Sequence, residues 1–435
     1  MNIKDDSRKV NDGDIFIALT KVNDGHLYIE EAIKNGASTV IVEKGEYEVE
    51  TITVPDTHEY LVDYLKREYY SEIKDLKLIG MTGTNGKTTT CFLIYQALNL
   101  LNKKCAYIGT NGFYIDKKIK DLPNTTPDIL EIYELLLIAK KKKCEYIVME
   151  ASSHALDMNR LKGLKFEVGI FSNLTIDHLD YHKTFENYKK AKQKLFDMVT
   201  GITIVNIDDA NKDGFLRDNT IPYGIDMVSK YKCDINGSSF IFEKEEYKSK
   251  LIGKHNLYNL LVVITLLKYL KVDNIKEIIS KLEAPLGRMD IIKKRKKAVI
   301  IDYAHTPDAV EKIILTIKEL KKYKIITLIG CGGDRDKTKR PLMAKVATSL
   351  SNYVIITSDN PRNEDPKKIA SDMLHGLDTK NVEIIINREK AIIKGIQRLK
   401  NNDILLVLGK GHEKHQIIGN NKIPFDDKKI VLDNF

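Results

Sequence analysis

A glycine-rich turn is the clearest chemical feature of the sequence. It comprises residues 82–89 (TGTNGKTT), after an apolar run at 78–81 that is typical of a strand and before a Leu- and Ala-rich segment that is typical of a helix. Glycines let backbone N–H groups converge on phosphate oxygens, and the helix N-terminus adds partial positive charge. In such loops the lysine reaches the β- and γ-phosphates and the next hydroxyl binds Mg²⁺, roles that fall to Lys87 and Thr88. Although Met81 stands where the generic pattern has glycine, the turn predicts a phosphate site for ATP with Mg²⁺.

Two other side chains that could bind a cation follow predicted strands. Glu150 comes directly after the apolar run 146–149, and His178 lies beyond the run 168–171, within the string NLTIDHLDYH. In open parallel sheets, ligands bind at the carboxyl ends of the strands. We therefore expect Glu150 and His178 to lie at the ligand-binding edge of the sheet.

Polar residues also follow three predicted strands in the last third of the chain. They are Arg335 after 325–329, the string DNPR (359–362) after 353–357, and the string GKGHE (409–413) after 404–408. Arginine offers a planar fork to a carboxylate, and glutamate can pair with an ammonium group. DNPR alone would indicate only a β-turn with surface charges. Its place beside the other two groups favours a binding site for an amino acid.

The candidate site residues can form common sites only if the chain folds into sheets in which the strand ends lie side by side. Apolar runs rich in Ile and Val, separated by helical patterns, are typical of parallel strands buried on both faces. The pattern starts at Lys77 and restarts after Pro285 and Gly287, so a link between two doubly wound sheets is expected near residues 284–290. We predict an α/β fold with a small N-terminal α/β domain (1–76), a central P-loop domain with a doubly wound parallel sheet (77–286) and a C-terminal Rossmann-like domain (287–435). The predicted strands are 14–19, 39–43, 51–54, 78–81, 146–149, 168–171, 202–205, 298–302, 325–329, 353–357, 382–386 and 404–408, and helices are predicted over 28–36, 59–70 and 257–270.

The length and composition fit a folded protein of several domains. At about 150 residues per domain, 435 residues suggest about three domains. Hydrophobic residues make up 43% and charged residues 30%, a balance that argues against wholesale disorder. The net charge of +9 is spread along the chain and tryptophan is absent, so no nucleic-acid partner is expected.

The hydrophobic runs and the cysteines of the sequence indicate where in the cell the protein is located. No apolar run approaches the roughly 20 residues that span a bilayer, and the first residues lack the hydrophobic segment of a signal peptide. The five cysteines lie far apart without a CxxC pair, so neither a zinc ribbon nor a disulfide scaffold is expected. We expect a cytoplasmic protein without stable membrane association.

Taken in chain order, these strings resemble the Mur ligase family. The motifs that carry the resemblance are TGTNGKTT, NTTP (124–127), EASSHAL (150–156), NLTIDHLDYH (173–182), Lys192, 253–259, GRMD (287–290), DYAH (302–305), 332–341, DNPR and GKGHE, which together span nearly the whole chain. The resemblance implies an ATP-dependent ligase, expected to be a monomer, that adds meso-2,6-diaminopimelate to UDP-N-acetylmuramoyl-L-alanyl-D-glutamate in peptidoglycan precursor synthesis. ATP would phosphorylate the acceptor carboxylate, and the amine would then displace phosphate from the acyl phosphate. Such a reaction needs charge neutralisation and positioning more than a covalent nucleophile.

The resemblance implies four catalytic side chains: Lys87, Glu150, His178 and Lys192. The last three, together with Thr88, would be the Mg²⁺ ligands, and hard oxygen ligands suit that ion. Lys192 lies in YKKAKQK, a string that by composition alone indicates a solvated helix face. The resemblance instead implies that CO₂ carbamylates Lys192, which would turn a cation into an anion that helps to hold a second metal ion.

The resemblance also assigns binding residues to each substrate. Those for ATP are Gly83, Thr84, Asn85, Gly86, Lys87, Thr88, Thr89, Asn256, Arg288, Asp302 and His305. Those for the UDP-linked acceptor are Ser7 with its neighbour Arg8, Lys21, Val22, Asn23, Asn124, Thr125, Thr126, Ser152 and Arg160. Those for diaminopimelate are Arg335, Asp359, Asn360, Pro361, Arg362, Gly409 and Glu413. Because the ATP residues come from both sides of the predicted link, domain closure would exclude water from the reactants.

Departures from the family pattern concern the acceptor site. Met158 stands where the family usually has glutamine, and Lys21 stands where it usually has glycine. The chain begins close to the string DSR (6–8), so a shortened UDP-binding domain is expected, with part of the uracil pocket missing or rebuilt.

Several alternatives remain open. An enzyme of the same family that adds L-lysine would gain little from Arg362, because lysine lacks the second carboxylate. A non-catalytic ATP-binding paralogue would not need the complete set of predicted metal ligands. Folylpolyglutamate synthetases share the phosphate loop and sheet architecture but not the pair DNPR and GKGHE, and a nucleic-acid motor would need a localised basic stripe or stacking aromatics.

Overall fold

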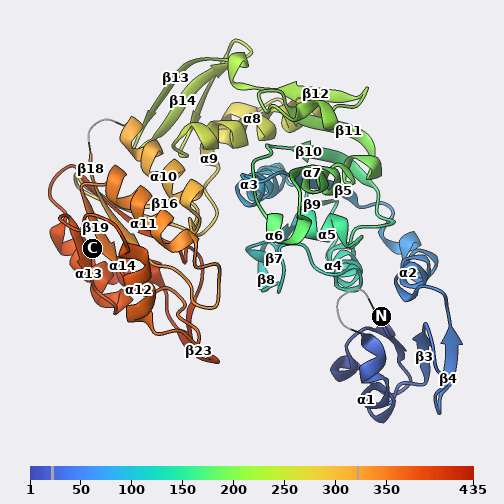
Figure 1. The fold of residues 1–435 in the computed structure, drawn as a ribbon. Helices are drawn as coiled ribbons and strands as arrows, with labels where there is room; N and C mark the ends of the chain where they lie inside the picture. Colours follow the sequence, from blue (N-terminus) through green and yellow to red (C-terminus); the bar gives the residue numbers. More distant parts are fainter. Residues whose placement is uncertain (21–23, 321–322) are drawn as a thin grey trace. The chain divides into compact units, whose positions relative to one another are not determined.

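The computed structural model describes residues 1–20, 24–320 and 323–435. The chain divides into two compact units (Figure 1). Unit 1 comprises Met1–Ile225 and Leu261–Asp273, and unit 2 comprises Asp226–Leu260 and Asn274–Phe435. The division into three domains at residues 76 and 286 stays a prediction.

Unit 1 begins with a small parallel sheet in the order β1-β2-β3-β4. Its strands are β1 (Ile3–Lys4), β2 (Ile15–Ile17), β3 (Thr39–Val42) and β4 (Glu50–Thr53), and its helices are α1 (Ile29–Lys34) and α2 (Thr57–Ile73). Side chains alternate between the two faces of a strand. Val40 and Val42 accordingly join a core with α1, whereas Ile41 joins a core with α2 that continues into the next sheet.

The central sheet of unit 1 has the order β12-β11-β10-β5-β9-β6-β7-β8. It is parallel from β12 to β6, and β7 and β8 extend it in antiparallel fashion. The strands are β5 (Lys77–Thr82), β6 (Cys105–Gly109), β7 (Gly112–Ile115), β8 (Lys117–Lys120), β9 (Tyr146–Glu150), β10 (Phe166–Phe171), β11 (Val199–Asn206) and β12 (Thr220–Tyr223). The helices around it are α3 (Lys87–Leu100), α4 (Ile129–Lys141), α5 (Ser153–Asp157), α6 (Leu179–His182) and α7 (Phe185–Gln193) (Figure 1). Because Met81 pairs with Glu150 and Thr82 with Phe171, β10, β5 and β9 end at the same edge.

Unit 2 begins with an antiparallel sheet of β13 (Val228–Asp234), β14 (Gly237–Phe242) and β15 (Glu245–Ser249). Helix α8 (Lys254–Tyr269) contributes residues to both units, and α9 (Ile275–Lys281) follows it. A β-hairpin near the C-terminus is formed by β22 (His415–Ile418) and β23 (Asn421–Pro424).

The main sheet of unit 2 has the order β16-β17-β21-β18-β19-β20. All neighbouring strands are parallel except β16 and β17. The strands are β16 (Asp290–Lys294), β17 (Lys297–Asp302), β18 (Lys324–Ile329), β19 (Tyr353–Ile356), β20 (Val382–Ile384) and β21 (Asp403–Leu408), and the helices are α10 (Pro307–Glu319), α11 (Lys339–Leu350), α12 (Pro366–Leu374), α13 (Arg388–Arg398) and α14 (Asp427–Asn434). Ile300 packs in a core with α10, α11 and α12, whereas its neighbours Val299 and Ile301 pack in a second core with α13 and α14. Helices thus cover both faces of this sheet, and the predicted α/β class with doubly wound sheets is confirmed.

Among the described residues, no helix is long and apolar enough to cross a membrane.

Candidate active site

The phosphate loop is held in place by the segment that follows β10. Asn173 accepts hydrogen bonds from the amide of Thr84 at its carbonyl (2.8 Å) and from the amide of Asn85 at its side-chain oxygen (2.9 Å). Ser172 Oγ donates to the carbonyl of Asn85 (2.7 Å). At Gly83, where φ is +145°, an added Cβ would lie 2.0 Å from Ser172 Oγ, so only glycine fits. The predicted turn therefore has a fixed shape at the N-terminus of α3.

The carboxylate of Glu150 is buried beside the start of α3. Its Oε1 accepts hydrogen bonds from Tyr107 Oη (2.6 Å) and the amide of Thr110 (2.9 Å), and its Oε2 accepts one from Thr88 Oγ1 (2.9 Å). Burial, reinforced by the Glu150 carboxylate, raises the pKa of Tyr107 well above its usual value, so this phenol stays a hydrogen-bond donor. An added Cβ at Gly109 would lie 2.2 Å from Glu150 Oε1. Close packing thus directs Oε2 of Glu150 toward Thr88.

The chemistry of this pair suits a magnesium ion. The Thr88 hydroxyl and the Glu150 carboxylate are hard oxygen donors, and Mg²⁺ in nucleotide sites is typically bound through one or two protein oxygens together with substrate phosphates. In the described part of the chain, no three His, Cys, Asp or Glu side chains form a group that could hold a metal ion by themselves. The residues present therefore fit a metal that arrives with a nucleotide.

Lys192 lies under the phosphate loop. Its side chain is 1% exposed, and its Nζ donates to the carbonyl of Gly83 (2.8 Å) and lies 4.5 Å from the ring centroid of Tyr188. Lys87 Nζ donates to the same carbonyl (2.7 Å) and to that of Thr84 (3.0 Å). Burial, together with the Lys87 charge, holds the pKa of Lys192 well below its ordinary value. The composition of YKKAKQK indicated a solvated lysine, but the structure buries it beside the predicted ATP site.

His178 contacts the aromatic ring that packs on Lys192, since the ring centroids of His178 and Tyr188 lie 6.3 Å apart. It stands at the N-terminus of α6 with φ of +52°, and its side chain is 48% exposed. Its ring lies edge-on to that of His154, with centroids 4.8 Å apart, and its Nε2 is 3.5 Å from Asp177. Within the described residues, His178 makes no hydrogen bond or ring contact with Thr88 or Glu150. The predicted catalytic role of His178 stays a prediction.

A network of hydroxyl groups joins the phosphate loop to the string NTTP. Thr110 Oγ1 lies 3.2 Å from Glu150 Oε2 and 3.1 Å from Thr125 Oγ1. Thr126 Oγ1 donates to the carbonyl of Glu150 (2.6 Å) and accepts from the amide of Ser152 (3.0 Å). Thr125 and Thr126 in the loop before α4, and Ser152 after β9, are therefore linked to the residue whose carboxylate faces Thr88.

Beyond this network lies a cavity of about 770 Å³ in unit 1. The predicted acceptor residues Ser7, Asn124 and Arg160 line it, as do Arg8 and Met158. Arg160 pairs through Nε with Asp128 (2.8 Å) and donates through Nη1 to the carbonyl of Thr126 (3.1 Å), while Ser7 donates to Glu31 (2.6 Å). The predicted contacts Lys21, Val22 and Asn23 lie outside the described residues.

In unit 2, three residues of the predicted ATP site gather around Tyr303, the residue that follows β17. Asp302 accepts hydrogen bonds from the amides of Met289 and Ala304 (both 2.8 Å), and burial raises the pKa of its carboxyl. The guanidinium of Arg288 lies 5.0 Å from the ring centroid of Tyr303, and the ring of His305 lies 4.7 Å from the same ring. Arg288 Nε is buried without a hydrogen-bond partner in the described chain, which leaves a donor for a ligand.

The fourth predicted ATP residue of unit 2, Asn256, is hydrogen-bonded within α8 and to the residue two positions before that helix. Its side chain donates to the carbonyl of Ile252 (2.9 Å) and accepts from Asn259 (3.0 Å). Among the described residues, no hydrogen bond joins the side chain of Asn256 to the residues around Tyr303.

The strings DNPR and GKGHE interlock after β19 and β21. Asn360 Nδ2 donates to Glu413 Oε2 (2.9 Å), and Asn360 Oδ1 accepts from Lys410 Nζ (2.9 Å) and from the amide of Ile417 (3.0 Å). Burial raises the pKa of Asp359, and an added Cβ at Gly409 would lie 2.5 Å from its Oδ2. The two strings therefore form one packed site, as the strand-end rule predicts.

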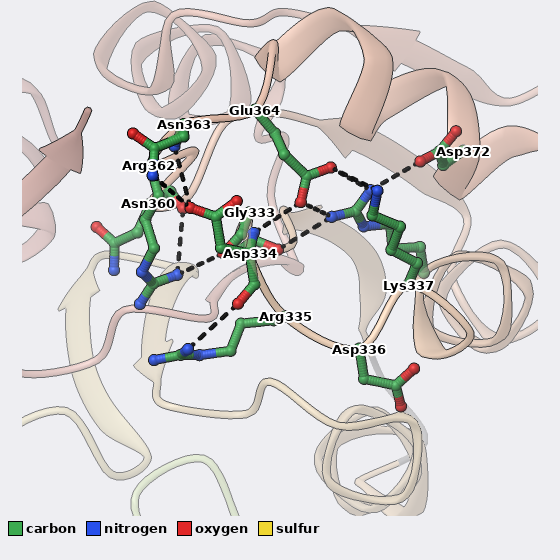
Figure 2. Close-up of polar contacts among 12 residues, drawn as sticks. Gly333, Asp334, Arg335, Asp336, Lys337, Asn360, Arg362, Asn363, Glu364 and Asp372 are labelled. Atoms are coloured by element: carbon green, nitrogen blue, oxygen red, sulfur yellow. Dashed lines mark hydrogen bonds and ion pairs between the residues drawn. The ribbon is translucent and has the colours of Figure 1, made fainter. Parts of the chain in front are cut away.

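Arg362 is fixed through its backbone by the hairpin. Its amide donates to the carbonyl of Ile417 (3.1 Å), and its carbonyl accepts from the amide of Gly419 (2.8 Å), which holds Arg362 at a φ of +50°. The side chain donates through Nη1 to the carbonyl of Gly333 (2.9 Å). Figure 2 shows Arg335 and Arg362 pointing away from Glu364.

Behind these two arginines, an ion-pair cluster around a buried arginine supports the loop 332–338. Arg340, which is fully buried, donates to both carboxylate oxygens of Glu364 (3.0 and 2.8 Å) and to Asp372 (2.7 Å). Glu364 also accepts from the amide of Asp334 (2.6 Å) (Figure 2). This cluster positions the exposed Arg335.

Sequence reasoning missed several residues that hold the site together. Tyr107 and Thr110 orient Glu150, Tyr188 packs on Lys192, and Lys410 joins DNPR to GKGHE. Lys410 lies inside a string that was already singled out, and Tyr188 precedes Lys192 by one helical turn, so their positions gave a signal although their residue types did not. Tyr107 carried none, because a tyrosine in an apolar run indicates only core.

Comparison with known proteins agrees with this geometry. The model of the Mur ligase middle domain matches residues 81–267, and that of the Mur ligase, glutamate ligase domain matches residues 287–411. The UDP-N-acetylmuramoyl-L-alanyl-D-glutamate–2,6-diaminopimelate ligase of Clostridium perfringens is 40% identical over 459 aligned positions, which cover 99% of this chain and 94% of that protein.

Solved structures show the same relationship. A structure described as a UDP-N-acetylmuramoyl-L-alanyl-D-glutamate–2,6-diaminopimelate ligase superposes with a TM-score of 0.72 at 33% identity, covering 100% of this chain and 94% of the other. The MurF ligase of Thermotoga maritima, solved in complex with ADP, shares the fold with a TM-score of 0.66 at 18% identity and coverage of 100% and 96%. The chain therefore belongs to the Mur ligase family.

Proposed function

We propose that this chain is an ATP-dependent ligase that joins meso-2,6-diaminopimelate to UDP-N-acetylmuramoyl-L-alanyl-D-glutamate in peptidoglycan precursor synthesis. Support comes from relatives that are about 40% identical over nearly the whole chain and carry this activity in their names. We also propose that the protein is cytoplasmic and monomeric.

The observation that carries the proposal is the hydrogen-bond network between the phosphate loop and the string NTTP. The Glu150 carboxylate accepts a hydrogen bond from Thr88 and lies within hydrogen-bonding distance of Thr110. The Thr110 hydroxyl is in turn within hydrogen-bonding distance of the Thr125 hydroxyl. A ligase of this type must bring the terminal phosphate of ATP to an acceptor carboxylate. A nucleotide on the phosphate loop and an acceptor in the cavity lined by Asn124 and Arg160 would meet at this network.

In the first step, a carboxylate oxygen of the acceptor attacks the γ-phosphorus of ATP, the bond to the bridging oxygen breaks, and ADP leaves. Lys87 neutralises charge on the β- and γ-phosphates, and backbone amides of the loop bind their oxygens. Bound Mg²⁺, which Thr88 and Glu150 would hold, supplies further positive charge to the phosphates. Lys192, once carbamylated, would place a negative charge beside the loop for a second ion.

In the second step, the amine of the amino acid attacks the acyl carbon, loses a proton and expels phosphate. Diaminopimelate carries an ammonium and a carboxylate at each end, so one end can react while the other is bound. Arg362 and Arg335 suit the carboxylate of the bound end, and Glu413 suits its ammonium. Lysine offers only the ammonium, so this set favours diaminopimelate.

A substrate-omission assay tests the proposal. The purified protein should release phosphate from ATP only when Mg²⁺, the UDP-linked dipeptide and diaminopimelate are all present, and mass spectrometry should detect the UDP-linked tripeptide. Equal turnover with lysine would refute the amino-acid specificity. No turnover with either amino acid would refute the ligase activity and favour a non-catalytic paralogue.

A further inference from the structure

A lysine lies buried at the centre of the predicted amino-acid site. The side chain of Lys410 is 0% exposed, and its Nζ bonds to Asn360 Oδ1 (2.9 Å) and to Glu413 Oε2 (2.7 Å). Lysine is almost never fully buried unless it is paired, because an unpaired charge inside a protein is costly. The ion pair with Glu413 therefore explains how Lys410 is accommodated, and it offsets the charge of Glu413.

The same contacts fix which oxygen of Glu413 remains available. Lys410 and Asn360 both donate to Oε2, and among the described residues none donates to Oε1. The amide of Ile417 holds Asn360 in turn. Although burial pushes the pKa of Glu413 upward, the Lys410 ammonium and the hydrogen bond from Asn360 lower it below its ordinary value. Glu413 is thus a charged carboxylate with one free oxygen and a cation attached to the other.

This arrangement bears on the choice between diaminopimelate and lysine. Both amino acids carry a distal ammonium, but only diaminopimelate carries a distal carboxylate. An unpaired glutamate would attract the distal end of lysine, which carries a net positive charge, whereas it would attract the ammonium and repel the carboxylate at the distal end of diaminopimelate. A glutamate paired with Lys410 accepts a hydrogen bond from the ammonium but offers it little net charge, so more of the binding energy must come from a carboxylate on Arg362.

We infer that Lys410 is a positioning residue that makes the site selective for a second carboxylate, because it neutralises Glu413 and fixes its free oxygen. The inference rests on the proposed function and adds to it a residue that determines specificity.

The test is a competition between equimolar diaminopimelate and lysine, with the UDP-linked dipeptide and ATP, in which mass spectrometry measures the ratio of the two products. Lys410→Met should lower the diaminopimelate-to-lysine product ratio by about tenfold or more, because the freed Glu413 charge now attracts lysine. The apparent KM for ATP should not change. Lys414→Met is the matched control: Lys414 lies in the same segment, is 60% exposed and pairs with Asp426, and its loss should leave the ratio unchanged.

A second variant shows whether Lys410 acts through Glu413. In Lys410→Met/Glu413→Gln no carboxylate is freed, so the gain in lysine product should disappear. If Lys410→Met lowers both products in the same proportion, or if the double variant also gains lysine product, the inference is overturned.

Glu413→Gln alone keeps the test decisive if Lys410→Met does not fold, as judged by its thermal unfolding. The Glu413→Gln substitution leaves the Lys410 charge unpaired, so the ratio of diaminopimelate product to lysine product should rise. An unchanged ratio would overturn the inference. A wild-type protein without turnover on either amino acid would instead refute the proposed function.

Discussion

Lys87 and Lys192 donate hydrogen bonds to one acceptor, the backbone carbonyl of Gly83, at 2.7 and 2.8 Å. Lys87 begins α3, whereas Lys192 comes from α7 and is almost completely buried. Because burial and the Lys87 charge disfavour a second ammonium, Lys192 has a pKa well below its ordinary value. The neutral amine is the form that adds to CO₂, so this environment favours the carbamylation that the family resemblance implies.

Replacement of Lys192 should separate nucleotide binding from chemistry. We expect Lys192→Ala to lower turnover by roughly 10³-fold, since a charge that acts on the transferred phosphoryl group is lost, while ATP still binds. Turnover is measured by phosphate release and ATP binding by calorimetry. A short carboxylic acid such as formate should restore part of the activity if the missing group is a carbamate. Lys190→Ala, which changes an exposed lysine of the same helix, should leave turnover unchanged.

Arg362 should determine the affinity for diaminopimelate. Arg362→Ala is expected to raise the apparent KM for diaminopimelate by about 10- to 100-fold, equivalent to about 1.5–3 kcal/mol for a charge-assisted hydrogen-bonded pair. Arg362→Lys should give an intermediate KM, because it keeps the charge but loses the planar fork. The KM for ATP serves as the internal control and should not move. A KM for diaminopimelate that stays at the wild-type value would remove Arg362 from the site.

The buried pair Arg388–Asp427 should dominate the stability of the C-terminal sheet. Both side chains are 0% exposed, Arg388 donates to both oxygens of Asp427 (2.8 and 2.7 Å), and it also donates to the carbonyl of Leu408 (3.0 Å) at the end of β21. Arg388→Leu should lower the free energy of unfolding by about 3–5 kcal/mol, because it leaves the Asp427 charge uncompensated. Urea unfolding measures the effect. Arg388→Leu/Asp427→Leu should be less destabilised than Arg388→Leu, and an equal or larger loss would contradict the ion-pair explanation.

Glu364 should give a pH-dependent contribution to stability. Hydrogen bonds from Arg340 and from the amide of Asp334 lower the pKa of Glu364 from 4.5 to about 2. Since the unfolded chain then takes up the proton at a higher pH than the folded chain, this stabilisation is complete above the unfolded pKa and is lost as the pH falls from 4.5 toward 2. Glu364→Gln should therefore be less stable than wild type near neutral pH, and the difference should shrink between about pH 5 and pH 3 in urea unfolding. A difference that does not change with pH would show that the ionised carboxylate of Glu364 is not the cause.

Much of the fold could be predicted because the central strands are buried on both faces. Runs such as 78–81 and 404–408 contain few polar residues, and they form β5 and β21 with ends that differ by a residue or less. The structure has Glu150 and DNPR at the carboxyl ends of β9 and β19, the strand ends at which the sequence predicted them, and their role in ligand binding stays a prediction. The strand-end rule could not identify the contacts of His178, because a loop beyond a strand end has no periodicity to fix its course.

Most of the strands that the sequence did not predict are short, polar or antiparallel, with the exception of β6, which is buried along its length and parallel to β9. The strands β13 and β15 contain exposed lysine and glutamate residues among few apolar ones, and β22 and β23 are half-exposed or exposed. Their stability comes from pairing with a neighbour rather than from their own pattern. Lys410 escaped notice for a related reason, since a lysine between two glycines indicates a solvated turn until its partners Asn360 and Glu413 are seen.

The small N-terminal sheet shares a continuous apolar interior with the sheet that holds the phosphate loop. Ile3, Ile17 and Ile41 belong to the same buried cluster as Ile132 and Leu136 of α4, and α2 packs between them. Deletion of the first 76 residues would therefore expose an apolar surface of the central sheet to solvent rather than leave an independently folded domain. The acceptor cavity and the phosphate loop should consequently unfold in a single transition. The cavity should keep its shape whether or not acceptor or nucleotide is bound.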